Sequence, residues 1–234
     1  MTKLFIATPA FDGKVNVSYA CALAETRVYL ASHAIETVMR IHTSGSLLVR
    51  ERNDLIKAFL ESDCTHMLMI DSDIAWNPLD VQRMINFDED FVASLYPARG
   101  PEKCFLFRGI YGENKRMDVS KKGLLEMEYI PAGFMMLRRV VFEKMMEYFP
   151  ELHYIPKDES LKHTEGYCLF DTEVWDGEFW GEDHVFCRRA RQAGFKIWID
   201  PSIRLDHAGV AGAFVEALTD KKPDEVVVSK SNEG

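Results

Sequence analysis

Residues 66–73 read His-Met-Leu-Met-Ile-Asp-Ser-Asp, and this stretch decides the fold class. Its first five residues form an apolar run without polar alternation, which is typical of a strand covered on both faces of a sheet. The acidic triplet Asp71, Ser72 and Asp73 follows at once. Because ligands of open α/β sheets bind at the carboxyl ends of the strands, the stretch predicts both an α/β fold and a polar site.

The segments before this strand predict the opening of a βαβ unit. Residues 3–8 form a short β-type run that Pro9 ends. Apolar residues recur at helical spacing over 15–32, and residues 35–42 alternate like a second strand. Ser46 is a candidate cap for a helix over 47–61, which leads into the 66–70 strand.

The second half of the chain predicts a mixed sheet. Residues 91–96, 105–111 and 124–130 read as strands in antiparallel hairpins, separated by Gly, Pro and charged turns. A strand over 133–137, helices over 139–148 and 181–193, and a strand over 195–199 follow, with Gly194 at a carboxyl cap. We expect one α/β domain over 1–210, then a helix and a tail over 211–234. Its sheet should be mixed but mostly parallel, flanked by helices, with a small antiparallel subsheet.

The composition limits the classes of function. The 234 residues, 47% of them hydrophobic, fit one α/β domain with a substantial core. A formal net charge of -9 argues against a broad electrostatic grip on nucleic acid or on an anionic membrane. The longest apolar runs are too short for a membrane span. The five cysteines have no zinc-like or paired spacing, so we expect reduced thiols in a cytoplasmic protein.

The acidic triplet is the strongest candidate for chemistry. Two carboxylates separated by one residue after a buried strand can face the same space, where oxygen ligands suit Mg²⁺ or Mn²⁺. An acidic triplet also arises by chance, and Asp88-Glu89-Asp90 is a second instance that we interpret as a solvated turn. The position at the end of an apolar strand favours a functional role for Asp71 and Asp73.

Three further positions are weaker candidates. Arg52, on the helix before the strand, has the planar fork that binds phosphate, although a surface arginine is the alternative. Glu182 and Asp183 open a helix, where capping alone explains acids, or where one of them faces an acceptor hydroxyl as general base. The neighbouring Phe179 and Trp180 suit a sugar face but are equally typical of a core. His207 is a possible metal ligand, although a lone histidine usually is not one.

The order of these motifs resembles the nucleotide-sugar glycosyltransferases of GT-A fold. The resemblance rests on Ala-Thr-Pro at 7–9, Arg-Asn at 52–53, the strand and triplet at 67–74, the stretches at 131–139 and 181–187, and Asp-His-Ala-Gly at 206–209. It covers roughly residues 3 to 210, and several motifs in one order are more specific than any one of them. Among proteins of this fold, the chain resembles the amino-terminal glycosyltransferase domain encoded by large chlorella viruses, and this resemblance implies viral glycosylation in a host cytoplasm.

The resemblance implies a division of labour along the chain. Residues 1–100 would bind the nucleotide-sugar donor and residues 101–210 the acceptor. The donor would contact a set of residues from four segments, with Mn²⁺ or Mg²⁺ held by Asp73 and His207, and with Asp71 near the ribose or the metal. The implied donor contacts are Thr8, Pro9, Arg52, Asp71, Ser72, Asp73 and Gly133. Asp183 or Glu182 would be the catalytic or sugar-positioning carboxylate.

The expected activity is therefore metal-dependent transfer of one sugar from a nucleoside-diphosphate sugar, by resemblance a UDP-sugar, to a glycan, glycoprotein or other hydroxyl acceptor. The Gln-x-x-Arg-Trp sequence of processive synthases is absent from the chain, which favours single transfer. Retaining and inverting stereochemistry both stay open. A silent sugar-nucleotide or glycan-binding module is the main alternative. An Asp-dependent phosphatase is less favoured, because its nucleophile is expected on a first strand.

Overall fold

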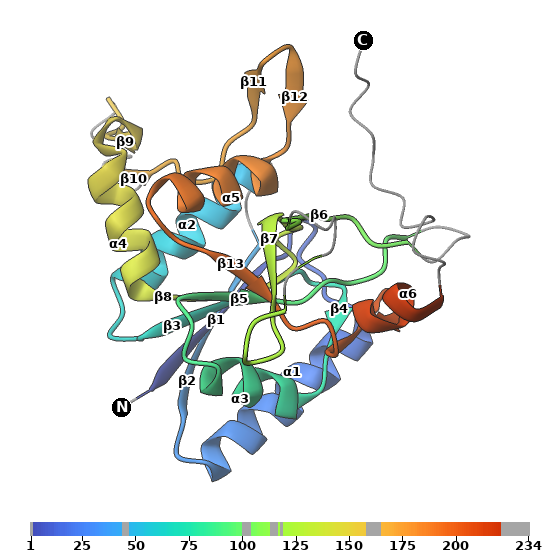
Figure 1. Ribbon diagram of the computed structural model, residues 1–234. Helices are drawn as coiled ribbons and strands as arrows, with labels where there is room; N and C mark the ends of the chain where they lie inside the picture. Colours follow the sequence, from blue (N-terminus) through green and yellow to red (C-terminus); the bar gives the residue numbers. More distant parts are fainter. Residues whose placement is uncertain are drawn as a thin grey trace.

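A computed structural model describes residues 2–43, 47–99, 104–112, 117, 119–157 and 165–220. Within these ranges the main sheet has eight strands in the order β2-β1-β3-β8-β5-β13-β7-β6. Figure 1 shows this sheet running through the middle of the molecule. The strands are β1 (Lys3–Pro9), β2 (Glu36–His42), β3 (His66–Ile70), β5 (Phe91–Ala93), β6 (Arg108–Gly109), β7 (Leu125–Tyr129), β8 (Phe134–Arg138) and β13 (Ile197–Ile199).

The directions of the strands confirm a mixed sheet in which most strands point the same way. Strand β1 pairs in parallel with β2 and β3, and β13 pairs in parallel with β5. Strands β8 and β7 run against their neighbours, so the remaining strands of the sheet share one direction. The antiparallel β6–β7 pair matches the hairpin expected between 105–111 and 124–130. The strand expected over 91–96 is present as β5, but its expected hairpin is wrong, because β5 lies between β8 and β13. The strand expected over 105–111 is likewise reduced to Arg108–Gly109.

Helices cover both faces of the sheet. Helices α1 (Val17–Ser32) and α3 (Pro78–Asn86) lie on one face, and α2 (Leu48–Leu60), α4 (Arg139–Tyr148) and α5 (Glu182–Gln192) lie on the other (Figure 1). Asn16 caps α1 by accepting a hydrogen bond from the backbone of Ser18, and Asn77 caps α3 in the same way. The sequence reading missed α3. The proposed cap Ser46 lies outside the described residues, and Leu47 caps α2 without a side-chain hydrogen bond.

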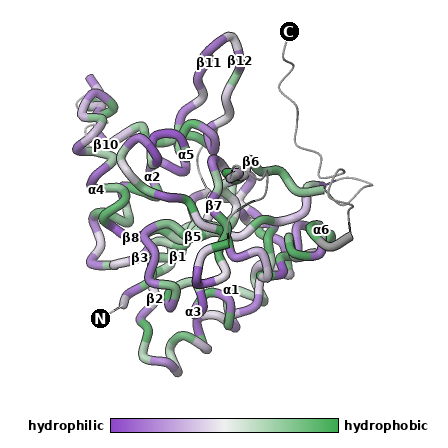
Figure 2. The backbone as a smooth tube through the Cα atoms, in the orientation of Figure 1, coloured by the Kyte–Doolittle hydropathy of each residue, from purple (hydrophilic) through white to green (hydrophobic). Residues whose placement is uncertain are grey.

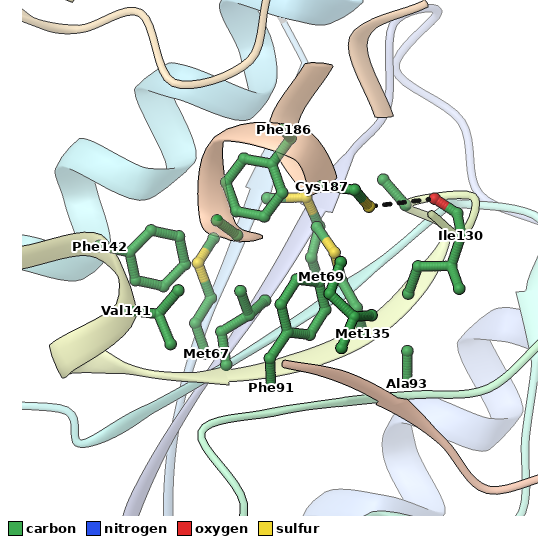
Figure 3. Packing of buried hydrophobic residues seen from close by; sticks show 14 of the residues in the cluster. Met67, Met69, Phe91, Ala93, Ile130, Met135, Val141, Phe142, Phe186 and Cys187 are labelled. Carbon is green, nitrogen blue, oxygen red and sulfur yellow. Dashed lines mark hydrogen bonds between the residues drawn. The ribbon is translucent and has the colours of Figure 1, made fainter. Parts of the chain in front are cut away.

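Two hydrophobic clusters, one on each face of the sheet, form the core. Alternate side chains of strand β3 belong to different clusters: Met67 and Met69 lie in one, and Leu68 and Ile70 lie in the other. All four side chains are fully buried. The central strands are accordingly among the hydrophobic segments in Figure 2, and Figure 3 shows Met67 and Met69 packed with aromatic rings from α4, β5 and α5. The apolar run therefore predicted its environment correctly.

Smaller elements complete the described part of the chain. Strands β4 (Ile74–Ala75), β14 (Arg204–His207) and β15 (Val210–Ala213) form an antiparallel sheet, with β14 in the middle. Strand β9 (His153–Tyr154) pairs with β10 (Gly166–Tyr167) beyond the short helix η1 (Pro150–Leu152), and β11 (Glu173–Trp175) pairs with β12 (Glu178–Trp180). Helix α6 (Phe214–Asp220) is the expected late helix, and the tail beyond it lies outside the described residues.

The cysteines are free thiols. Across the residues that the structure describes, no helix has the length and apolar character needed to cross a membrane.

Candidate functional site

The candidate site lies at the carboxyl end of β3, where the acidic triplet begins. The backbone N–H of Asp71 donates to the carbonyl of Gly133 at 3.0 Å, which extends the β3–β8 pairing by one residue. The carbonyl of Ser72 accepts a 2.8 Å hydrogen bond from Asn16, the cap of α1. The triplet is thus held between β8 and the start of the first helix, so its turn is defined by backbone hydrogen bonds on both sides.

Asp73 and His207 come together although they are far apart in the chain. Strand β14 pairs with β4 so that His207 lies opposite Ile74, and Ala208 donates its N–H to the carbonyl of Asp73 at 2.9 Å. This register brings Nε2 of His207 within 3.4 Å of Oδ2 of Asp73. Both side chains keep less than a fifth of their surface exposed. Asp73 and His207, the two metal ligands that the resemblance implies, are therefore neighbours.

The tautomer of His207 follows from its other nitrogen. Nδ1 lies 2.8 Å from the carbonyl oxygen of Pro97, which can only accept, so Nδ1 carries a proton. In the neutral ring, Nε2 then presents a lone pair toward the carboxylate of Asp73. Two electron-rich atoms at this distance repel each other unless a cation lies between them or the ring is protonated. A carbonyl that orients the imidazole in this way is typical of histidine ligands to metals.

The donor set of this pair fits a divalent cation. A carboxylate oxygen and an imidazole nitrogen suit Mn²⁺, and the carboxylate also suits Mg²⁺. Among the described residues no group of three or more His, Cys, Asp or Glu side chains is arranged to hold a metal ion. Further ligands of a cation at this pair would have to come from outside these side chains. A metal role for Asp71 stays a prediction, because its Oδ1 is already engaged by Arg52.

Arg99 is a further charged group at this pair. Its guanidinium forms an ion pair with Oδ2 of Asp73, the same oxygen that faces His207. The Arg99 side chain is 63% exposed, so little packing holds it there. The sequence reading missed Arg99, which lies in a turn without any motif. In this structure a positive charge thus already compensates Asp73.

Arg52 is the centre of a buried ionic network. Its side chain is 3% exposed, and Nη2 donates to Oδ1 of Asp71 at 3.0 Å. Nε lies 3.7 Å from Oε1 of Glu182, and the guanidinium packs over the ring of Phe170. Burial alone would lower the pKa of Arg52, but the carboxylates of Asp71 and Glu182 outweigh it and raise the pKa. Arg52 therefore joins two predicted motifs, the acidic triplet and the Glu-Asp pair; direct contact with a donor stays a prediction.

Gly133 is required by the close approach of two other side chains. A Cβ built on Gly133 would lie 2.5 Å from Oη of Tyr96 and 2.7 Å from Oδ2 of Asp71. Only glycine fits without displacing one of them. Tyr96 in turn meets the ring of His207 edge to face, with centroids 4.9 Å apart. Burial, followed by the charge of Asp71, raises the pKa of Tyr96 and keeps it a neutral donor. The sequence reading missed Tyr96, which links the Asp73–His207 pair to Asp71.

Asp183 and Glu182 play different structural roles at the start of α5. Glu182 faces Arg52, whereas Oδ1 of Asp183 accepts from the backbone of His184 at 2.8 Å and lies 2.9 Å from its Nδ1. Burial would raise the pKa of Asp183, but these hydrogen bonds and the His184 ring outweigh it and lower the pKa. Asp183 is therefore ionised at neutral pH. The His184 ring also packs against Tyr129, with centroids 3.6 Å apart.

Thr8 and Pro9, the predicted nucleoside contacts, are both buried at the end of β1. The hydroxyl of Thr8 lies 2.5 Å from that of Tyr19 on α1, so it is already hydrogen-bonded inside the protein. Ala10, the next residue, donates its N–H to the carbonyl of His42. The structure places these residues beside the triplet end of the sheet but leaves a nucleoside contact by Thr8 a prediction.

Known proteins with similar structures include glycosyltransferases of GT-A fold, all at low sequence identity. S. aureus TarS 1–349 in complex with UDP-GlcNAc matches with a TM-score of 0.49 and 12% identity, over 85% of this chain and 56% of that chain. GalNAc-T7 with UDP, GalNAc and Mn²⁺ matches with a TM-score of 0.47 and 11% identity, over 88% and 43%. A glycosyltransferase involved in glycosylation of the major capsid of PBCV-1 matches with a TM-score of 0.37 and 11% identity, over 61% and 62%.

These likenesses set no activity for the chain. No protein-family model matches the sequence, and a search of curated proteins gives no match. The chain spans little more than half of the TarS structure and less than half of GalNAc-T7. A putative glucose-1-phosphate thymidylyltransferase from Bacillus anthracis also matches, with a TM-score of 0.41 and 11% identity, over 90% of each chain.

Proposed function

We propose that this chain is a metal-dependent glycosyltransferase that moves one sugar from a nucleoside-diphosphate sugar to a hydroxyl of a glycan or glycoprotein. The observation that carries the proposal is the meeting of Asp73 and His207 at the carboxyl end of β3, with a lone pair of His207 facing the carboxylate. A carboxylate oxygen and an imidazole nitrogen at this distance form a donor set for a divalent cation, whose remaining ligands would come from the diphosphate of a donor. A UDP-sugar is the proposed donor, by analogy with the ligands of TarS and GalNAc-T7.

The chemistry of the proposed reaction fits the charges of the site. A divalent ion held by Asp73 and His207 would stabilise the negative charge that grows on the leaving diphosphate. Asp71, held by Arg52 at 3.0 Å, presents its other oxygen toward Tyr96 and Gly133, where it can accept from a donor hydroxyl. Asp71 is thus held by Arg52 before substrate binds, which reduces the reorganisation needed during reaction.

Asp183 is the proposed acceptor-side carboxylate. Because its pKa is lowered, it is fully ionised and can accept a hydrogen bond from the attacking hydroxyl. Glu182 is less suited to this role, because its carboxylate faces the buried Arg52. In this proposal residues 1–100 bind the donor and residues 101–210 bind the acceptor. Arg52 then connects the two halves through Asp71 and Glu182.

The phosphatase alternative gains no support from the geometry. A phosphatase needs an aspartate free to attack phosphorus, and Oδ1 of Asp71 is engaged by a buried arginine while Asp73 faces His207. A silent binding module would have the same contacts as an active transferase. Turnover is therefore the measurement that separates these two.

The experiment is thermal unfolding with UDP, GDP or dTDP, each with and without Mn²⁺, on wild type, Asp73→Asn and His207→Gln. Because a ligand that binds the folded state raises the melting temperature, one nucleotide should stabilise the wild type in a Mn²⁺-dependent manner, and neither variant should respond. Asp90→Asn is the matched control, because it alters the second acidic triplet, whose Asp90 lies near Arg138 outside the site. It should respond like the wild type.

The same samples test turnover. Incubation with the UDP-sugars and Mn²⁺ should release UDP slowly by hydrolysis, and faster once an acceptor is present. Nucleotide binding without any release would establish a silent module. Absence of metal-dependent stabilisation by every nucleotide, or full stabilisation of Asp73→Asn, would refute the donor site.

A further inference from the structure

The hairpin β11–β12 and the outer face of α5 enclose a hollow that the donor site does not use. The hairpin extends from the body of the protein next to α5 (Figure 1). The hollow has a volume of about 320 Å³, at the lower end of the range for small-molecule sites. Two indoles, a phenol and an imidazole form much of its wall. The lining includes Tyr129, Trp175, Trp180, His184, Arg188 and Gln192.

The register of the hairpin places both tryptophans on one face. Glu173 pairs with Trp180, and Trp175 pairs with Glu178, so these four side chains share a face. The rings of Trp175 and Trp180 have centroids 6.0 Å apart, and the indole N–H of Trp180 donates to the carbonyl of Trp175 at 3.1 Å. Trp175 remains 55% exposed. Two oriented indoles thus present apolar surface to the hollow before any ligand binds.

Among the described residues, the opposite face of the hairpin is lined by two exposed side chains. Val174 and Phe179 pair across the strands and are 75% and 74% exposed. Phe179 was a candidate sugar contact in the sequence, and the alternation of the strand directs it away from the hollow. Trp180, its neighbour, lines the hollow instead.

The charges in the wall are already compensated. Arg188 forms an ion pair with Glu173 and packs over the ring of Trp175. Arg191 lies 3.4 Å from Glu126, and Glu128 lies 3.0 Å from Arg108. A ligand that adds a net charge would disturb these pairs. The hollow therefore favours a neutral ligand with apolar faces and many hydroxyls.

The hollow is connected to the candidate acceptor carboxylate through His184. The ring of His184 lines the hollow, packs against Tyr129, and lies 2.9 Å from Oδ1 of Asp183. We propose that this hollow binds a neutral pyranose ring of a glycan acceptor, stacked on Trp175 and Trp180, with a hydroxyl directed toward Asp183. The C–H faces of a pyranose are apolar and its edges carry hydroxyls, which matches the aromatic walls and the polar edge formed by Arg188 and Gln192. This assignment rests on the proposed transferase function.

The test is NMR of the tryptophan indole N–H signals during titration with neutral oligosaccharides. The chain has four tryptophans, so Trp76 and Trp198, which lie outside the hollow, serve as internal controls. The ligands are chitotetraose, cellotetraose, maltotetraose and mannotetraose. We expect at least one of them to shift the signals of Trp175 and Trp180 and to leave the other two unchanged. Trp175→Ala should weaken that binding about tenfold, as expected for one lost stacking partner, and Trp175→Phe should restore part of it.

Val174→Ala is the matched control, because it removes an apolar side chain from the opposite face of the same hairpin and should bind like the wild type. The inference is overturned if no oligosaccharide shifts the two signals, if UDP shifts them instead, or if Trp175→Ala binds as tightly as Val174→Ala. Thermal stabilisation by nucleotide and Mn²⁺, measured on the same samples, distinguishes failure of the hollow as an acceptor site from failure of the proposed function. If the protein binds nucleotide but no oligosaccharide shifts the two signals, the acceptor site in the hollow is refuted and the proposed transferase function is not.

Discussion

Replacement of Arg52 by methionine tests the ionic network that joins the two halves of the site. Methionine preserves much of the apolar stem but leaves the carboxylates of Asp71 and Glu182 without their cation. Removal of one partner from a buried ion pair costs about 3–5 kcal/mol. Asp71 and Glu182 keep 26% and 22% of their side-chain surface exposed, so water compensates part of this loss. We therefore expect a destabilisation of about 3 kcal/mol, which lowers the melting temperature by roughly 6–12 °C for a domain of this size.

Arg50 provides the matched control on the same helix. Its side chain is 58% exposed and its Nε lies 3.8 Å from Oδ2 of Asp54. Such an exposed helical pair contributes about 0.3–0.5 kcal/mol, so Arg50→Met should change stability by no more than that. Urea unfolding followed by circular dichroism measures both variants under identical conditions. Equal stabilities of Arg50→Met and Arg52→Met would refute the assignment of a buried network.

A second mutation separates lost packing from uncompensated charge. Asp71→Asn in the Arg52→Met background removes one of the two orphaned charges, so the double variant should recover about 1 kcal/mol relative to Arg52→Met alone. Strictly additive effects of the two substitutions would show that the guanidinium contributes through packing alone.

Two further predictions concern the same site. Gly133→Ala should lower the unfolding free energy by about 1–3 kcal/mol through overpacking, and it should weaken Mn²⁺-dependent nucleotide binding. Gly109→Ala should lower the unfolding free energy by less, because its added Cβ meets the flexible side chain of Met117. Unfolding free energies of both variants and their nucleotide titrations check this, and an equal cost at the two glycines would contradict it. Asp183→Asn should destabilise the protein most above the ordinary carboxyl pKa of 3.8, because the lowered pKa in the folded state contributes stability there. That contribution is lost as the pH falls through the pKa of Asp183 in the folded state. The difference in unfolding free energy between Asp183→Asn and the wild type, measured with urea, should therefore narrow below pH 3.8. A difference that stays constant from pH 6 to pH 3 would contradict the assignment.

The sequence predicted those elements whose conformation depends on residues within the same segment. The apolar run before the acidic triplet predicted a buried strand, because all of its side chains must be covered whichever face they point to. The periodicity of α1 and the acids at the start of α5 predicted helices for similar reasons, and Gly194 adopts the positive φ expected after a helix. The short helix α3 was missed, although Asn77 and Pro78 form a cap and first turn that signal its start.

The features of the candidate site also separate into those set by local sequence and those set by tertiary contacts. The sequence by itself determined that a carboxylate triplet ends a buried strand, because burial and strand end are local properties of residues 66–73. Only the tertiary structure decided that His207 faces Asp73, since this depends on the register of β14 against β4, a pairing between distant segments. It also decided that Tyr96 and Asp71 close upon Gly133, that Arg52 is buried rather than exposed, and that Trp175 faces α5 while Phe179 faces outward. Contacts of this kind are set by how separate elements pack, and no spacing within a single segment specifies them.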